Sequence, residues 1–235
     1  MALTGLLRHA QSKTQTVIKM KVVKRRNRQM TMERILRAMG DVMAERGTEK
    51  AGINAVADRA GVNKVLIYRY FGGWNGLLEA YVQRGFFLSM FNDKFLESVP
   101  ESLPAENRSK VWSEYTIQFM REFRARRSSQ ELIRWEMSHG ETELARRLAE
   151  FRDQSYKNLV DKLAPYSDFD PIAITSLMVS AVTHMVLISS QRDKIADIDL
   201  RTDAGWERIE TAIRRIYSSL NIALERENAK KPDGQ

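Results

Sequence analysis

Apolar residues recur at helical spacing along almost the whole chain after residue 30, and this pattern constrains the fold more than any other feature. Between residues 32 and 43 they stand three or four positions apart, on one face of a helix. No segment shows the alternation of a half-buried strand, and no Asn-Gly or Asp-Gly turn joins two such segments. The sequence therefore predicts an all-α protein.

The interruptions of this pattern divide the chain into helices. A first helix is expected from its N-cap at Thr31 to Gly47, and short helices are expected at 53–60 and, after Asn63 as N-cap, at 64–71. Later helices are predicted at 75–97, 106–126, 128–138, 141–164, 170–191 and 203–226, with turns at 165–170 and 193–202. This order predicts a small three-helix unit followed by a larger helical bundle.

Positive charge is concentrated at the start of the chain. The net charge is +8, and residues 1–30 hold eight basic residues and no acidic one, so the rest of the chain is balanced. Such an arm is typical of proteins that bind nucleic acid or an anionic membrane. We expect residues 1–28 to be a flexible arm in which Lys24, Arg25 and Arg26 contact phosphates or the minor groove.

The composition argues against an enzyme or a metal protein. The chain has no cysteine, so thiolate metal sites, disulfides and cysteine nucleophiles are excluded. Its three histidines are far apart and lack the spacing of metal ligands, and no Walker or GxSxG motif occurs. We expect no catalytic site, no metal and no cofactor.

The segment 52–71 has the features of a helix-turn-helix. Two short predicted helices meet at Ala60-Gly61, where glycine allows a tight turn and small residues allow close packing. In such a motif the start of the second helix enters the major groove. There Asn63 can pair with adenine, Lys64 can reach guanine or phosphate, and Val65 can meet a thymine methyl.

The same segment resembles the TetR family of bacterial transcriptional repressors. Order and spacing agree from Ile35-Leu36 through Val56-Ala57, Ala60 to Asn63 and Ile67 to Phe71 as far as Leu77-Leu78. The sequence departs from the family where Ala51 and Gly52 replace Thr or Ser, Tyr70 replaces His and Trp74 replaces Lys. The expected DNA-binding residues are Arg28, Thr31, Gly52, Asn54, Asn63, Lys64, Val65, Leu66, Tyr68, Arg69 and Tyr70.

The resemblance implies three further parts. Residues 29–80 would form the DNA-binding domain, 81–228 an effector-binding and dimerisation domain, and 229–235 a polar tail. By this resemblance the bundle would hold a small apolar effector. The candidate pocket residues are mainly aromatic: Phe87, Met90, Phe91, Trp112, Tyr115, Phe119, Trp135, Met137, His139, Tyr156 and His184. For each aromatic residue, however, a place in the core is the competing interpretation, as it is for both histidines.

Two apolar helices are the candidates for a dimer interface. The run 172–188 falls short of a membrane span and is interpreted as a buried helix, and 206–223 carries a heptad-like stripe. The expected interface residues are Ile174, Met178, Ala181, Met185, Trp206, Ile209, Ile213, Ile216 and Leu220. The alternative is that both apolar stripes pack only within the core of one chain.

Together these observations predict a cytoplasmic, nucleoid-associated homodimer that represses transcription. It would bind double-stranded DNA at a palindromic operator and be released by the effector, without contacting a membrane. The alternative is a less specific protein whose basic arm drives binding to DNA or to an anionic membrane.

Overall fold

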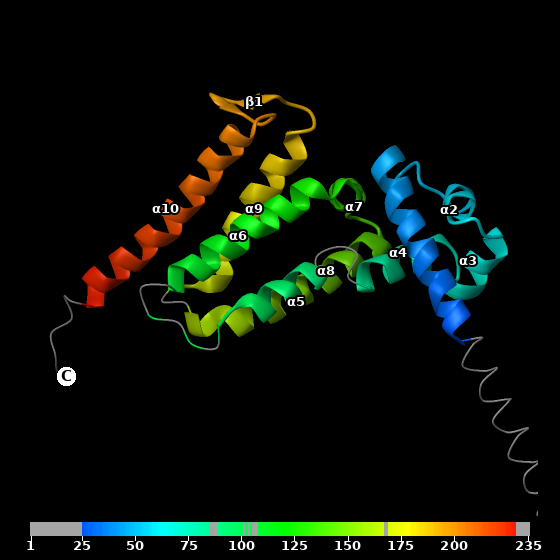
Figure 1. The fold of residues 1–235 in the computed structure, drawn as a ribbon, viewed down its shortest axis with the longest axis horizontal. Helices are drawn as coiled ribbons and strands as arrows, with labels where there is room; N and C mark the ends of the chain where they lie inside the picture. Colours follow the sequence, from blue (N-terminus) through cyan, green and yellow to red (C-terminus); the bar gives the residue numbers. More distant parts are fainter. Residues whose placement is uncertain are drawn as a thin grey trace, which may run out of the picture.

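A computed structural model describes residues 25–84, 89–100, 102, 104, 108–166 and 169–228, which are almost entirely helical (Figure 1). The N-terminal unit comprises α1 (25–46), α2 (Ile53–Ala60) and α3 (Lys64–Phe71), and α4 (Trp74–Gln83) connects it to the bundle. The bundle contains α5 (Ser89–Ser98), α6 (Arg108–Ala125), α7 (Arg127–Ser138), α8 (Glu143–Leu163) with the 3-10 turn η2 (Ala164–Tyr166), α9 (Pro171–Ile188) and α10 (Asp203–Asn228). The predicted all-α class and three-helix unit are confirmed.

The first helix differs from the prediction at its start. It is already helical at residue 25, so residues 25–28, which were assigned to the arm, belong to α1. Thr31 lies inside the helix, where its hydroxyl donates to the Asn27 carbonyl oxygen at 2.8 Å. Thr31 is therefore not an N-cap, because the backbone before it is already helical.

Two other parts of the chain also differ. The helix expected over 75–97 is two helices, because α4 ends at Gln83 and α5 begins at Ser89. The connection 193–202, for which the sequence predicts turns, contains an antiparallel hairpin of β1 (Lys194–Ile195) and β2 (Ile198–Asp199). Strands of two residues are too short to show an alternating pattern in the sequence.

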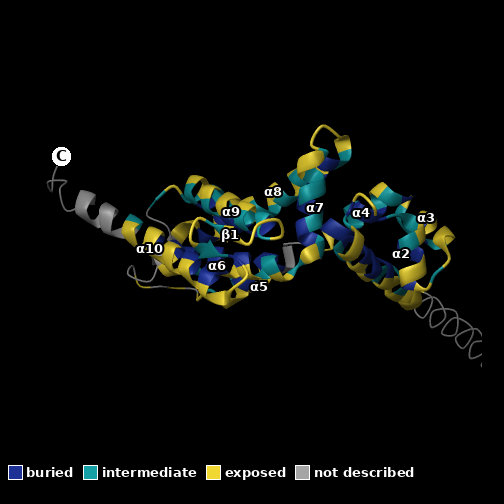
Figure 2. Ribbon diagram, turned by 90° about the horizontal axis from the view of Figure 1, so that it is seen from above, coloured by how far each residue is buried: buried dark blue, intermediate teal, exposed yellow. Residues whose placement is uncertain are grey.

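The core of the N-terminal unit lies under α1. Its apolar face (Ile35, Leu36, Met39, Val42 and Met43) is fully buried against residues of α2, α3 and α4. Figure 2 shows these buried surfaces turned toward one another, with exposed residues outside. Each such side chain stabilises the fold by about 1.5–3 kcal/mol, so α1 holds the short helices in place.

The bundle is organised around α6, which packs against both α9 and α10. Its aromatic face is buried, and an ion pair at its edge fixes α10: Arg121 donates twice to Glu210, each bond 2.6 Å long. The Glu210 side chain is only 6% exposed. A bidentate guanidinium–carboxylate pair of this kind fixes orientation as well as distance.

Helix α9 is only partly buried. Within the described residues it is the one helix whose length and apolar composition would allow it to cross a membrane. The expectation of a buried helix holds for one face, which contains Thr175, Val182, Val186 and Leu187. The opposite face exposes Leu177, at 68%, together with Ala173 and Ala181. The described part of the chain therefore leaves an apolar strip of α9 uncovered.

We predict that Gly76→Ala destabilises the protein. A Cβ at Gly76 would lie 1.8 Å from the Phe71 carbonyl oxygen, whereas one at Gly140 would meet nothing closer than 3.8 Å. Alanine normally favours a helix, but here the backbone between α3 and α4 must shift, which costs about 2 kcal/mol or more. Chemical denaturation should show this loss for Gly76→Ala and little change for Gly140→Ala. Equal stability of the two variants would contradict the close approach.

Candidate nucleic-acid interface and ligand cavity

Helices α2 and α3 meet at the tight turn that the sequence predicts. Gly61 adopts φ 61°, in the left-handed region that glycine tolerates, and no neighbouring atom would touch a Cβ there. Glycine is therefore needed for its backbone conformation and not for space. Val56 and Ile67 are fully buried, so they fix the inner faces of the two helices.

The start of α3 faces solvent. Val65 is 61% exposed and Tyr68 is 55% exposed, while Lys64 and Arg69 are also exposed and Leu66 is half-buried. A fixed helix with an exposed apolar residue beside a lysine and an arginine is suited to base edges and phosphates in a groove. These predicted DNA-binding residues therefore lie together on the free face of α3.

Asn63 is the N-cap of α3, as predicted. Its Oδ1 accepts a hydrogen bond from the Val65 backbone N–H at 2.9 Å. A bidentate pair with adenine would use the same oxygen and the amide nitrogen. The cap competes with that role, and the structure supports the capping role.

An aromatic–cation cluster joins the first turns of α1 to the end of α3. The Arg28 guanidinium carbon lies 5.2 Å from the centroid of the Tyr70 ring, and the corresponding Arg69 carbon lies 5.0 Å away. Arg69 also donates to the Tyr70 hydroxyl at 3.1 Å. Two cations on one ring form a compact positive site. The sequence pointed to each residue but not to their contact, which depends on how α1 packs.

The remaining predicted interface residues are more scattered. Gly52 precedes α2 in extended backbone and supplies no side-chain cap, whereas Asn54 is exposed in the first turn. Thr31 is half-buried on α1, and Arg25 and Arg26 are exposed at its start. Lys24 lies outside the described residues.

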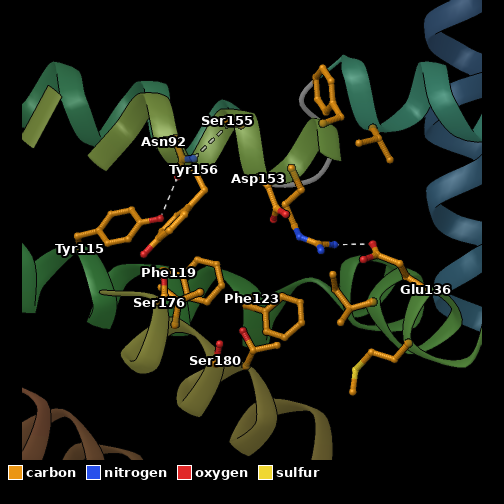
Figure 3. Close-up of a pocket in the computed structure, with 17 residues that line it drawn as sticks. Asn92, Tyr115, Phe119, Phe123, Glu136, Asp153, Ser155, Tyr156, Ser176 and Ser180 are labelled. Atoms are coloured by element: carbon orange, nitrogen blue, oxygen red, sulfur yellow. Dashed lines mark hydrogen bonds and ion pairs between the residues drawn. The ribbon is translucent and has the colours of Figure 1, made fainter. Parts of the chain in front are cut away.

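The bundle contains a cavity of about 300 Å³ lined mainly by α6, α7, α8 and α9, with one residue each from α4 and α5 (Figure 3). Its walls are mainly apolar and include Phe119, Phe123, Ile133 and Val179. Among the predicted pocket residues, those that line it are Tyr115, Phe119, Met137 and Tyr156.

The other predicted pocket residues lie elsewhere, because they pack into the core or onto each other. Trp112 packs against Phe169, and Trp135 stacks on His139, whose Nδ1 is 2.9 Å from the Trp135 carbonyl oxygen. Phe91 packs on other rings of the core, and His184 is exposed, so it lies neither in the predicted pocket nor in the core. Phe87 and the side chain of Met90 lie outside the described residues.

Polar groups in the cavity lie at defined places. Asn92 accepts from the Tyr115 hydroxyl at 3.3 Å and donates to Ser155 at 3.4 Å, while Arg152 donates to Glu136 (Figure 3). The buried hydroxyl of Tyr156 makes no hydrogen bond of good geometry. Burial raises the pKa of Tyr156 to about 12, so this hydroxyl stays protonated at neutral pH.

Sequence reasoning missed the charged and hydroxyl residues of the cavity. Arg152, Asp153 and Glu136 look like residues of a solvated helix face, and Ser176 and Ser180 interrupt an apolar run without any motif. Only the packing of four helices brings them together. The apolar spacing of α8 and α9 was the available sequence signal for these cavity residues. That spacing indicates that a helix face is buried and does not indicate that it contacts a ligand.

The predicted dimer residues fall into three groups. Trp206, Ile209 and Ile213 are buried in the core of the same chain, so this part of the α10 prediction is corrected: the heptad-like stripe packs on α6. Ile174, Met178, Met185 and Leu220 are partly buried against the same core. Ala181 and Ile216 are exposed.

The comparisons with known proteins agree with this architecture. Residues 30–81 match the model of the bacterial regulatory proteins of the tetR family. The fatty acid degradation regulator FadR from Bacillus halodurans has a similar fold, with a TM-score of 0.61, 20% identity, and coverage of 79% of this chain and 97% of that chain. No curated protein sequence matches the chain.

Two further solved structures share the fold. FadR from Bacillus subtilis in complex with stearoyl-CoA has a TM-score of 0.61 and 16% identity, covering 80% of this chain and 97% of that one. GusR from Salmonella enterica has a TM-score of 0.56 and 18% identity, covering 81% and 94%. The molecule is thus an all-α helix-turn-helix protein. Its residues 30–81 match the tetR-family model, so the resemblance seen in the sequence is confirmed for this segment, and the fold of the whole chain is that of the regulators named above.

We predict that Asn63 contributes to DNA binding through its cap. Asn63→Ala should lower the free energy of unfolding by about 1 kcal/mol, because the Val65 N–H loses its acceptor. Asn63→Ser, which keeps an acceptor, should retain stability and the preferred DNA sequence. Chemical denaturation and a selection from random duplexes measure both effects. A changed base preference in the stable serine variant would instead make Asn63 a base reader.

Proposed function

We propose that this protein is a dimeric repressor that binds a palindromic operator and is released by a small molecule held in the bundle. The observation that carries this proposal is the free face of α3, where Lys64, Val65, Tyr68 and Arg69 are exposed on a helix fixed from behind by buried Ile67. A single helix of eight residues reads few bases. A twofold dimer places two such helices at half-sites about 34–36 Å apart.

The uncovered apolar strip of α9 supports dimerisation. Leu177, Ala173 and Ala181 on α9 and Ile216 on α10, which is 46% exposed, are among the apolar positions that the described part of the chain leaves uncovered. A second copy supplies matching surfaces through a twofold axis. Of the interface residues predicted from the sequence, the proposed interface keeps Ala181 and Ile216. It does not use the predicted α10 residues that are buried within the chain, and the outer face of α9 takes their place.

We predict that Leu177→Lys together with Ile216→Lys yields a monomer. Two charges on each copy would face each other across the twofold axis, which opposes association. Sedimentation velocity should show the loss of the dimer, and operator affinity should fall. Met30→Lys, at an exposed methionine of α1, is the matched control and should remain dimeric. A dimeric double variant would place the interface elsewhere.

The cavity supports a compact, mostly apolar effector. Its volume of about 300 Å³ is at the lower end of the range for small-molecule sites. The buried Tyr156 hydroxyl, which makes no hydrogen bond of good geometry within the described residues, offers one to the ligand. Binding would reach the DNA-binding unit through α4, which contacts α7 by the 3.1 Å Tyr81–Ser128 hydrogen bond and α8 by the 3.1 Å Arg147–Glu79 ion pair.

We predict that Val179→Trp fills the cavity and removes the response to effectors. In the wild type, small aromatic compounds that fit should raise the melting temperature and weaken DNA binding, because they bind one conformation better than the other. Stearoyl-CoA, the ligand of the FadR structure, is a separate arm of the screen. The variant should bind DNA but lose the response. A ligand that acts equally on both proteins would exclude this cavity.

A selection from random duplex DNA at physiological salt tests the proposal as a whole. Enrichment of an inverted repeat supports a dimeric protein that binds a palindromic operator, which is the DNA-binding step of the proposed repressor. Tight binding that enriches no sequence and is lost at higher salt supports the alternative, a less specific protein whose basic arm drives binding. The eight basic residues among the first 30 are the observation that favours that alternative.

A further inference from the structure

A second hollow lies at the joint between the N-terminal unit and the bundle, away from the effector cavity. It has a volume of about 610 Å³ and is lined by α1, α2, α4 and the turn between α6 and α7. Five arginines from three of these segments face it, whereas Asp41 is the one acidic residue in its lining. The arginines are Arg34, Arg37, Arg59, Arg126 and Arg127.

Only two of these arginines are neutralised by the described part of the chain. Arg59 bonds to Glu45 at 2.5 Å and lies 3.9 Å from Asp41, and Arg126 bonds to Glu122 at 2.8 Å. The side chains of Arg34, Arg37 and Arg127, which are exposed, make no ion pair or hydrogen bond with any other described residue. Three uncompensated cations therefore share one hollow.

This concentration of charge is unfavourable for the isolated chain. Arg34 and Arg37 stand three positions apart on one face of α1, where like charges repel each other. Beyond residue 30 the chain is balanced between basic and acidic residues, so the excess in the hollow does not follow from the overall composition of that part of the chain. An anion bound among the three side chains would remove the repulsion.

The protein groups at the base of the hollow also suit an anion. Ser128 accepts a hydrogen bond from Tyr81 at 3.1 Å, so a hydroxyl lies beside the arginines. Helix α7 begins at Arg127 without a side-chain cap on its first N–H groups. The positive end of its dipole therefore adds to the arginines, which remain the main attraction.

We propose that this hollow binds a small molecule that carries a diphosphate group. Guanidinium groups match phosphate oxygens with paired hydrogen bonds. A diphosphate is favoured over a single phosphate because the uncompensated arginines come from two segments, α1 and the start of α7, which one larger anion can bridge.

Such a ligand would link the DNA-binding unit directly to the bundle. Arg34 and Arg37 belong to the helix that supports α3, whereas Arg127 belongs to the helix that lines the effector cavity with Glu136. Bridging them stabilises one arrangement of the two parts, so the ligand would change operator affinity without entering the cavity. This site goes beyond the proposed effector response and does not depend on it.

Binding of inorganic pyrophosphate to the full-length protein tests the proposal. Isothermal titration and thermal shift at about 150 mM salt, where weak surface attraction is screened, should show saturable binding of pyrophosphate and weaker binding of orthophosphate. ATP is the third arm: binding as tight as that of pyrophosphate indicates a nucleotide, and weaker binding indicates a smaller diphosphate. Arg37→Gln with Arg127→Gln should weaken binding by about tenfold or more.

A control variant with the same net charge distinguishes binding at the hollow from general electrostatic attraction between the protein and the anion. Arg192→Gln with Arg215→Gln removes two exposed arginines that do not line the hollow and should bind pyrophosphate like the wild type. Equal loss in both double variants, or no saturable binding by the wild type, overturns the proposal. If Arg37→Gln with Arg127→Gln instead weakens binding to random duplex DNA alone, the arginines serve DNA, and the proposal also fails. Melting temperatures without ligand confirm that both variants fold.

Discussion

The burial of one face of α1 is the interaction on which the rest of the structure depends. Helices of eight residues are too short to be stable alone, so α2 and α3 exist because they cover Ile35, Leu36 and Met39. The same burial leaves the opposite face of α3 free and holds Arg28 against Tyr70. Core packing and the exposed binding surface are therefore two results of one arrangement.

Local chemistry explains why the helix-turn-helix was predictable from the sequence. Gly61 and Gly72 end α2 and α3 in left-handed conformations, and Asn63 caps α3, so both predicted ranges coincide with the observed helices. Where boundaries depended on distant packing, prediction was poorer. Nothing in the local sequence showed that α1 is already helical at residue 25 or that α4 ends at Gln83.

The ligand cavity shows the limit of sequence reasoning most clearly. Aromatic residues were reasonable candidates, yet Trp112 and Phe91 fill the core while Arg152 and Ser176 line the cavity. Whether a side chain faces a void or a neighbour depends on the relative rotation of helices that are far apart in sequence. The α10 stripe was misassigned for the same reason, because an apolar face indicates burial without identifying its partner.

The contact of Arg28 with Tyr70 has a kinetic consequence for Arg25 and Arg26, which precede it in the first turn of α1. It holds this turn, where both arginines are exposed, beside the end of α3. If α3 binds DNA as proposed above, an encounter between these arginines and nearby phosphates becomes intramolecular, at a local concentration on the order of millimolar. When α3 dissociates from one sequence, this second contact would keep the duplex close, which favours rebinding nearby over escape into solution.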